Sequence, residues 1–375
     1  MKLLRKLFLS AAVSIAVPLL LPAQSNFDVN LQVDYSSAEQ LIGLCEGKLY
    51  NVGALADLKG SQLAAATSIL LARKPVPAEA FQHELELLRD NFTSREDLFG
   101  LAPARAHLAE IKALLDESKK RELDRRVVAT VQQFFPQESR ISASLSVFIV
   151  AFGHENASAF VRRVVWHGNT PVFVGENEGE PVIVVNLARL VNANPSTEVQ
   201  FIETLSTLAH ETFHAVFAVY QSSSPVWRMI NNERAPYWPL AEVVQNEGIA
   251  YRISFQEKTG GTLPPPVFNS VREAIPALNS AMLELASPTV TPARARELIM
   301  NANLSGTLER NYGAAAGLLM AFAIDAKLGR NALIETIVNG PADFFQKYDG
   351  LTQQYPELPK LSQDVLGELK EGGDR

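Results

Sequence analysis

Residues 199–220 read VQFIETLSTLAHETFHAVFAVY, with apolar residues recurring at helical spacing. This pattern predicts one amphipathic helix over Val199–Tyr220, because apolar residues three or four positions apart share a face. His210 and His214 are four residues apart, so their imidazoles project in nearly the same direction, one turn apart. On a helical wheel the pair lies opposite the apolar stripe, with Glu211 beside it. The helix therefore carries two candidate metal ligands away from its core-facing side.

His-Glu-x-x-His on a helix is the spacing of a catalytic zinc site. The chain has six histidines, so we estimate a chance of about 1% that the pattern arises somewhere by accident. A histidine buried in the core is the usual alternative for a single residue, but this pair avoids the apolar stripe. We therefore expect His210 and His214 to bind one zinc ion per chain.

A catalytic zinc site needs a third protein ligand, and Glu247 is the best candidate. It lies in Pro239–Tyr251, a second predicted helix that begins at a proline, as helices often do. Burying its carboxylate without a partner would cost several kcal/mol, which favours a metal, Arg or Lys beside it. A buried ion pair or a position lining a cleft is the alternative. On the wheel, Glu247 is surrounded by apolar and aromatic neighbours: Leu240, Val243, Val244, Ala250 and Tyr251.

Together, His-Glu-x-x-His and Asn246-Glu247-Gly248-Ile249-Ala250 resemble the gluzincin class of zinc metallopeptidases. The resemblance implies His210, His214 and Glu247 as metal ligands and Glu211 as the catalytic base. The spacer between the motifs is longer than in the aminopeptidases of that class, and their Gly-x-Met-x-Asn segment is missing before the histidines, so aminopeptidase specificity is not implied. The overall arrangement is more similar to little-characterised bacterial families described as zinc-dependent peptidases.

The reaction that this resemblance implies is peptide-bond hydrolysis by a zinc-activated water, with Glu211 as general base. Gluzincins often stabilise the oxyanion with a Tyr or His outside the motif. Tyr312, at the start of an alanine-rich helical run, is the first candidate for this role, followed by Tyr251 and His167. For each tyrosine the alternative is a ring that packs and a hydroxyl that bonds locally.

The expected fold class is α+β and predominantly α. Residues 26–136 form a predicted helical N-terminal region, and residues 137–375 a predicted zincin-like peptidase domain with a helical C-terminal part. Between them, short β-branched runs predict a small sheet just before the histidine helix, and one of its edges could pair with a peptide substrate. The predicted strands are Ser146–Phe152, Pro171–Val174 and Pro181–Leu187. The predicted N-terminal helices start at Ser36, in a capping-box pattern, and then span Ala78–Arg89, Pro103–Glu117 and Glu122–Phe134.

Residues 1–25 are typical of a signal peptide, because basic residues precede an apolar stretch and a small-residue cleavage site. We therefore expect an exported protein, periplasmic or extracellular, without a membrane span in the mature chain. Removing Lys2, Arg5 and Lys6 leaves 31 basic residues against 41 acidic ones, a net charge of −10. This charge argues against a nucleic-acid partner.

Three classes of function are compatible with these patterns. The first is an exported zinc peptidase acting on a peptide or protein substrate. The second is a non-catalytic protein of the same fold whose cleft holds a peptide or cell-wall fragment. The third is a helical assembly module in which the motif is accidental. The carboxylate of Glu211 argues against the second, because a binding scaffold has no electrostatic need for it. Zinc content separates the third from the other two. The oligomeric state is left open.

Overall fold

The computed structural model describes residues 26–49, 51–72, 74–77, 79–154, 158–175, 178–193, 196–232, 235–303 and 311–373. The predicted signal peptide, residues 1–25, lies outside these ranges. Within them, none of the helices has the combination of length and hydropathy that a bilayer crossing requires.

A five-stranded mixed sheet lies in the N-terminal half of the molecule, with strand order β1-β2-β5-β3-β4. The first three strands in this order run parallel, and β3 is antiparallel to both β5 and β4. The central strand β5 is buried on both faces, which accounts for its unbroken Val-Ile-Val-Val run. The strands span Phe27–Asp34 (β1), Ile141–Val150 (β2), Ala159–His167 (β3), Thr170–Phe173 (β4) and Glu180–Asn186 (β5).

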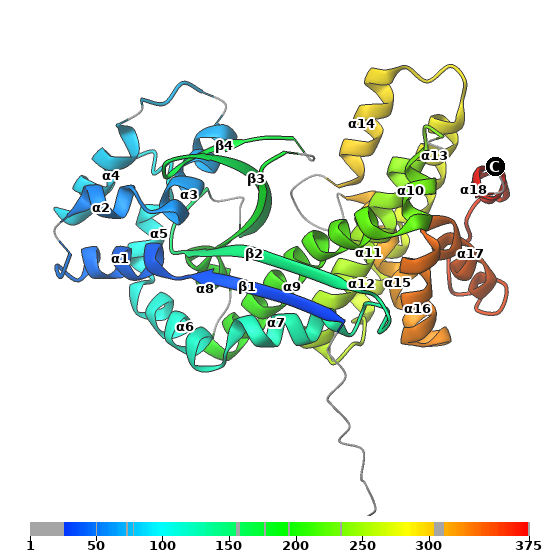
Figure 1. The fold of residues 1–375 in the computed structure, drawn as a ribbon, viewed down its shortest axis with the longest axis horizontal. Coiled ribbons are helices and arrows are strands. Elements are labelled where there is room, and N and C mark those ends of the chain that lie inside the picture. The colour runs from blue at the N-terminus through cyan, green and yellow to red at the C-terminus, as the bar shows by residue number, and fades with distance from the viewer. Residues whose placement is uncertain are drawn as a thin grey trace, which may run out of the picture.

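Helices cover both faces of this sheet (Figure 1). Helix α3 packs on one face, where Gly60 lies against the side chain of Phe148, and α9 runs along the other. The remaining N-terminal helices surround the end and the lower side of the sheet. The helices before the second strand are α1 (Ser36–Cys45), α2 (Val52–Ala56), α3 (Lys59–Ala72), α4 (Ala80–Arg89), α5 (Leu101–Ala106), α6 (Leu108–Lys120) and α7 (Leu123–Gln132).

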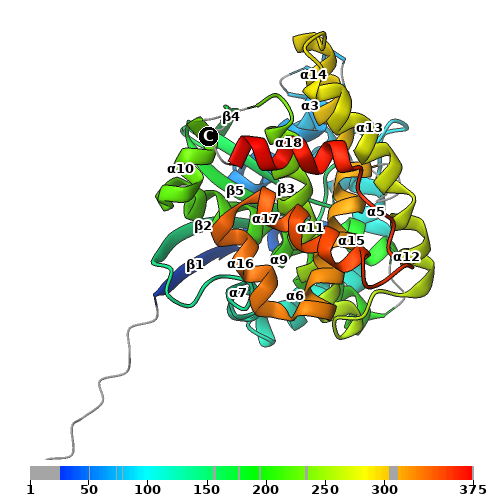
Figure 2. The ribbon, with the colours of Figure 1, turned by 90° about the vertical axis from the view of Figure 1, so that its right-hand side faces the viewer.

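The C-terminal half is helical and is joined to the sheet through α9, against which α11 packs. Figure 2 shows α15 to α18 covering the end of the molecule away from the N-terminal helices. Helices α11 and α15 approach so closely that a Cβ on Gly248 would overlap the carbonyl group of Gly317. The helices that follow the last strand, β5, are α8 (Leu187–Ala193), α9 (Thr197–Ser223), α10 (Pro225–Asn232), α11 (Trp238–Thr259), α12 (Pro265–Arg272), α13 (Ala274–Ala286), α14 (Pro292–Ala302), α15 (Tyr312–Leu328), α16 (Arg330–Asn339), α17 (Pro341–Thr352) and α18 (Gln363–Gly373).

The predicted fold class, α+β and predominantly α, is confirmed. Two strands were not predicted, β1 and β3, and β1 precedes residue 136 yet pairs along its whole length with β2. The helix predicted over Pro103–Glu117 is interrupted at His107, which ends α5 and begins α6. The capping box was also wrong, because the side chain that bonds the start of α1 is Asp34, whose carboxylate accepts from the Ser36 N–H at 2.7 Å.

Candidate metal centre

Helix α9 positions the two histidines. Its start is capped by Ser196, whose hydroxyl accepts from the Val199 N–H at 3.4 Å. The negative charge of Glu198 in the first turn interacts favourably with the positive end of the helix dipole. The stripe predicted to face the core is buried at Phe201, Leu205, Leu208 and Val216 and half-buried at Val219. The histidines project from another face, toward α11, and their side chains retain 13% and 18% exposure. They are therefore sheltered yet reachable from solvent.

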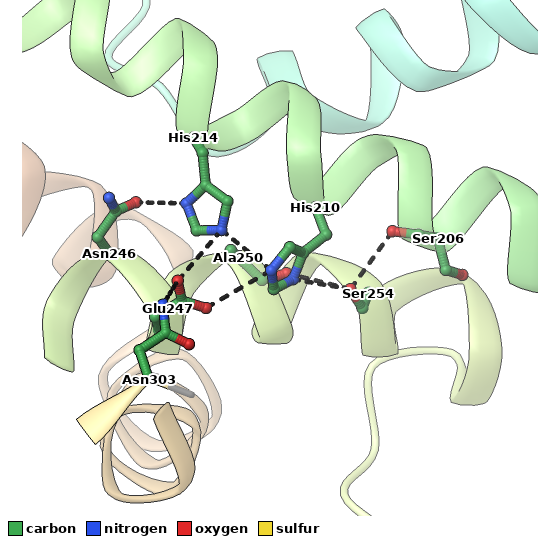
Figure 3. Close-up of polar contacts among 8 residues, drawn as sticks. All are labelled: Ser206, His210, His214, Asn246, Glu247, Ala250, Ser254 and Asn303. Atoms are coloured by element: carbon green, nitrogen blue, oxygen red, sulfur yellow. Dashed lines mark hydrogen bonds and ion pairs between the residues drawn. The ribbon is translucent and has the colours of Figure 1, made fainter. Parts of the chain in front are cut away.

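The side chains of His210, His214 and Glu247 converge between α9 and α11 (Figure 3). The two Nε2 atoms are 3.0 Å apart. Oxygens of the Glu247 carboxylate lie 3.5 Å from His210 Nε2 and 3.4 Å from His214 Nε2. Within the described ranges, no other group of three His, Cys, Asp or Glu side chains converges in this way.

The spacing of these donor atoms fits a zinc ion. Bonds of about 2.0–2.1 Å at tetrahedral angles place neighbouring ligand atoms about 3.3 Å apart. The separation of 3.0 Å between the imidazoles, and those of 3.4 and 3.5 Å from the two Glu247 oxygens to one imidazole each, lie close to that value. Two imidazole nitrogens that face each other at 3.0 Å also repel through their lone pairs, unless a cation or a proton lies between them. Two histidines and one glutamate are a ligand set found in catalytic zinc sites, which keep a fourth position open.

Polar neighbours orient both imidazoles through their second ring nitrogen. His214 Nδ1 lies 2.9 Å from the Asn246 side-chain oxygen. His210 Nδ1 lies 3.4 Å from the hydroxyl of Ser254, which is also close to the Ser206 and Ala250 carbonyl oxygens. An acceptor at Nδ1 fixes the tautomer in which Nε2 offers its lone pair to a metal. Within the Asn-Glu-Gly motif, Asn246 thus orients the imidazole of His214.

A residue that the sequence did not predict, Asn303, also contacts a candidate ligand. Its side-chain amide donates to Oε1 of Glu247 at 2.5 Å. Asn303 follows the last residue of α14, 56 positions after Glu247, and no local pattern marks it. Only the tertiary packing of α14 brings the two residues together.

The two glutamates of the centre have opposite electrostatic environments. Burial by itself raises the pKa of Glu247, but the nearby imidazoles of His214 and His210 and the Asn303 amide outweigh it and lower the pKa to about 2. Burial raises the pKa of Glu211 to about 7; the charge of Glu247 adds to this increase, while His214 and Arg162 oppose it. Glu247 is therefore held as a carboxylate, whereas Glu211 exchanges its proton near neutral pH.

The three predicted oxyanion donors lie in different places. Tyr312 is half-buried, and its hydroxyl donates to the Leu298 carbonyl at 2.7 Å. His167 is exposed at the turn between β3 and β4. Tyr251 packs its ring edge-on against His210 at 4.6 Å, and burial followed by the charges of Glu247 and Glu211 raises the pKa of its hydroxyl. Tyr251 is thus the one of the three beside the convergent ligands.

Comparison with known proteins points to a single family. The family described as "Putative zinc dependent peptidase (DUF5700)" matches residues 54–357, well over half of the chain, so the protein belongs to it. The matched region includes both motif helices, α9 and α11. No curated protein and no solved structure matches the chain.

Proposed function

We propose, on the premise that the protein belongs to this zinc-dependent peptidase family, that it hydrolyses peptide bonds with one zinc ion held by His210, His214 and Glu247. The proposal includes a gluzincin-type assignment of roles. The observation that carries it is the convergence of the His210, His214 and Glu247 side chains, in which one ligand atom from each lies within 4.8 Å of the others.

When bound, zinc supplies a Lewis acid that brings the pKa of a coordinated water toward 7. Glu211 is proposed as the general base that accepts a proton from the attacking water and delivers it to the leaving amine. Glu211 is suited to both transfers because its carboxyl group lies within the electrostatic reach of His214 and Glu247, next to the proposed zinc ion. Glu247 remains ionised throughout, since its pKa is held far below neutrality.

The open part of strand β3 supports a peptide as the substrate. Strand β4 pairs with Val164–His167 alone, and in the described chain no strand flanks Ala159–Val161 on that side. The Asn186 N–H bonds the Ser158 carbonyl, so by antiparallel alternation the main-chain groups of Ala159 and Val161 point away from β5. An extended peptide could add there by main-chain hydrogen bonds.

Arg162 connects this strand edge to the candidate centre. Its guanidinium donates to the Val161 carbonyl at 3.1 Å, and its charge lies near enough to Glu211 to oppose the rise in that carboxyl's pKa. A peptide aligned on Ala159–Val161 would therefore lie close to the proposed base. A binding site for an extended main chain next to the proposed base favours a protein that hydrolyses peptides over one that recognises the surface of a folded partner.

The test is Glu211→Gln, assayed with an unfolded protein or a peptide library together with metal analysis. We expect about one zinc per chain in both proteins and a loss of hydrolysis of about 10²–10⁴-fold, the usual contribution of a general base. Glu198→Gln, an exposed position on the same helix, is the matched control and should hydrolyse like the parent. A Glu211→Gln protein as fast as the parent would remove Glu211 from the mechanism. Zinc without any hydrolysis in the parent would favour the non-catalytic peptide-binding alternative.

The oxyanion donor is a separate part of the proposal. Tyr251 is the better candidate for this role, because its ring lies against His210, whereas the Tyr312 hydroxyl donates to the Leu298 carbonyl. Tyr251→Phe is expected to lower kcat by about 10²–10³-fold, the cost of one oxyanion donor. Tyr312→Phe is the comparison, and its loss is expected in stability, by about 1 kcal/mol, the net contribution of one hydrogen bond. The reverse result would restore Tyr312 to the catalytic role.

We also propose that the protein is exported after removal of residues 1–25, so that its peptide substrates lie in a periplasm or outside the cell. The sequence of the leader is the support for this proposal. Determining the amino-terminal sequence of the protein recovered outside the cytoplasm tests it, with a start near Asn26 expected. A protein that retains Met1 and stays in the cytoplasm would contradict it.

A further inference from the structure

Asn303 reaches the candidate metal centre from a part of the chain that contributes no ligand. Helix α14 projects from the body of the molecule in both overall views (Figures 1 and 2). Asn303, just after its last residue, lies beside Glu247 (Figure 3). Among the described residues, the polar partners of the three ligands otherwise come from α9 and α11 themselves. Asn303 is therefore a connection between the centre and a separate helix.

The inner end of α14 is held firmly in place. Ala302 is fully buried, and a Cβ added to Gly313 would lie only 2.8 Å from the Ala302 Cβ. One turn earlier, Leu298 is buried, and its carbonyl accepts the Tyr312 hydroxyl at 2.7 Å. These contacts fix the backbone just before Asn303, so its amide is presented to Glu247 at little further cost in conformational entropy.

The carboxylate of Glu247 needs such a partner. The last torsion of a glutamate side chain has a broad, roughly two-fold energy profile, so helix packing alone does not fix the rotation of the carboxylate. The bond from Asn303 to Oε1, at 2.5 Å, removes that freedom. In the fixed orientation Oε1 lies 3.4 Å from His214 Nε2 and Oε2 lies 3.5 Å from His210 Nε2. Both oxygens thus face the imidazole pair.

We infer that Asn303 is a positioning residue, which holds the Glu247 carboxylate toward the two imidazoles and so strengthens zinc binding at the proposed centre. The inference rests on the proposed function only for the presence of zinc, not for hydrolysis. Outer partners of this kind typically change metal affinity by about 10–100-fold. We expect an effect of that size from the Asn303 amide.

The experiment measures zinc affinity by competition with a chromogenic chelator, for the full mature chain. Asn303→Ala removes the donor, and Asn303→Leu removes it while keeping nearly the same size and branching. Both are expected to weaken zinc binding by about 10–100-fold. Asn301→Ala, two residues earlier on the same helix, is the matched control and should bind like the parent. The metal-free variants should stay folded at the temperature of the assay, with at most the modest drop in unfolding temperature that the loss of one hydrogen bond brings, which separates lost positioning from lost folding.

Each outcome decides the question. If Asn303→Leu binds zinc like the parent, the residue acts through packing and the inference is overturned. If both variants lose affinity but their metal-free forms are already unfolded at the temperature of the assay, Asn303 is a structural residue instead. A parent that binds zinc but cleaves nothing removes the peptidase proposal and leaves the affinity comparison valid. A parent that binds no zinc overturns both.

Discussion

Helix α11 carries two clusters of buried charge, five residues apart, which differ in what neutralises them. Around Arg252, the carboxylate of Asp325 contacts that guanidinium and also accepts from Arg330 at 2.8 Å, so both arginines pair with a carboxylate of the protein. Around Glu247, two imidazoles and a carboxylate converge with no Lys or Arg among their bonded partners. The charges of the first cluster are held as ion pairs within the protein, whereas the second cluster has the composition of a binding site.

The arginine cluster connects helices rather than presenting groups to a ligand. Arg252 and Asp325 have side chains only 7% and 6% exposed, and they connect α11 to α15. Arg330 adds α16 and stacks its guanidinium on Phe134 at 3.7 Å, which brings in the segment after α7. Burial raises the pKa of Asp325, but the two arginines more than offset this and keep it below its ordinary value. A lowered carboxyl pKa is found in both clusters, so it does not distinguish a candidate binding site from a structural ion pair. The convergence of unshared ligand atoms is found in the Glu247 cluster.

The largest expected effect separates the two clusters by metal content. His210→Ala should reduce zinc from about one per chain to near zero, because two remaining ligands hold the ion poorly. Asp325→Ala should leave zinc near one per folded chain. The measurement is elemental analysis after zinc reconstitution and desalting. Equal loss of zinc from both variants would mean that the two clusters are not independent.

The second effect is on stability and runs the other way. Asp325→Ala leaves Arg252 buried without its main counter-charge, so we expect a loss of about 3–5 kcal/mol in the free energy of unfolding. Asp116→Ala breaks the exposed pair with Lys112 and serves as the matched control, with an expected loss below about 1 kcal/mol. Urea unfolding of the metal-free proteins measures both. Similar losses in the two variants would show that the buried ion pair of Arg252 and Asp325 stabilises the fold no more than an exposed pair does.

The stability difference should also depend on pH. Since the pKa of Asp325 is lower in the folded chain, its contribution is fully present above the unfolded value of about 3.9 and disappears as the pH falls through the folded value. The gap between parent and Asp325→Ala should therefore be constant at neutral pH and narrow below about pH 4. Urea unfolding at a series of acidic pH values measures the gap. A gap that widens in acid would contradict this assignment.

The smallest expected effects rank the outer partners of the histidines. Asn246→Ala removes the contact to His214 at 2.9 Å, and zinc affinity should fall by about 10-fold or more. Ser254→Ala removes a longer contact to His210, 3.4 Å, and should cost less. Chelator competition measures both. The opposite ranking would indicate that His210 depends more strongly than His214 on its outer partner.

The convergence of the three candidate ligands was predictable from the sequence because it depends on helical geometry. His210 and His214 share a helix face, and Glu247 stood out as a carboxylate among apolar neighbours, so only the meeting of two helices was left to infer. Asn303 could not be found in this way, since its position depends on how α14 packs against α11 and α15. The order of Tyr312 and Tyr251 as oxyanion donors could not be predicted, because the sequence does not show that the Tyr312 hydroxyl meets the Leu298 carbonyl or that the Tyr251 ring meets His210.

The strands show a similar division. Strand β5 is an unbroken apolar run, so its sequence marks it without knowledge of its neighbours. Strand β1 alternates between apolar and polar residues, FDVNLQVD, so its sequence also carries the local pattern of a half-buried strand. Strand β3 contains Arg162 and Arg163, which interrupt any apolar pattern. Its position depends on pairing with β5, a contact that no local pattern specifies.

The contact between Gly248 and Gly317 has a consequence for how the centre could vary. Because a methyl group at position 248 would force α11 and α15 apart, the residue next to a candidate ligand is constrained by helix spacing and not by chemistry. At Gly248 and Gly317 any larger residue would separate the two helices, so evolution and protein engineering alike have little freedom at these two positions beside the centre.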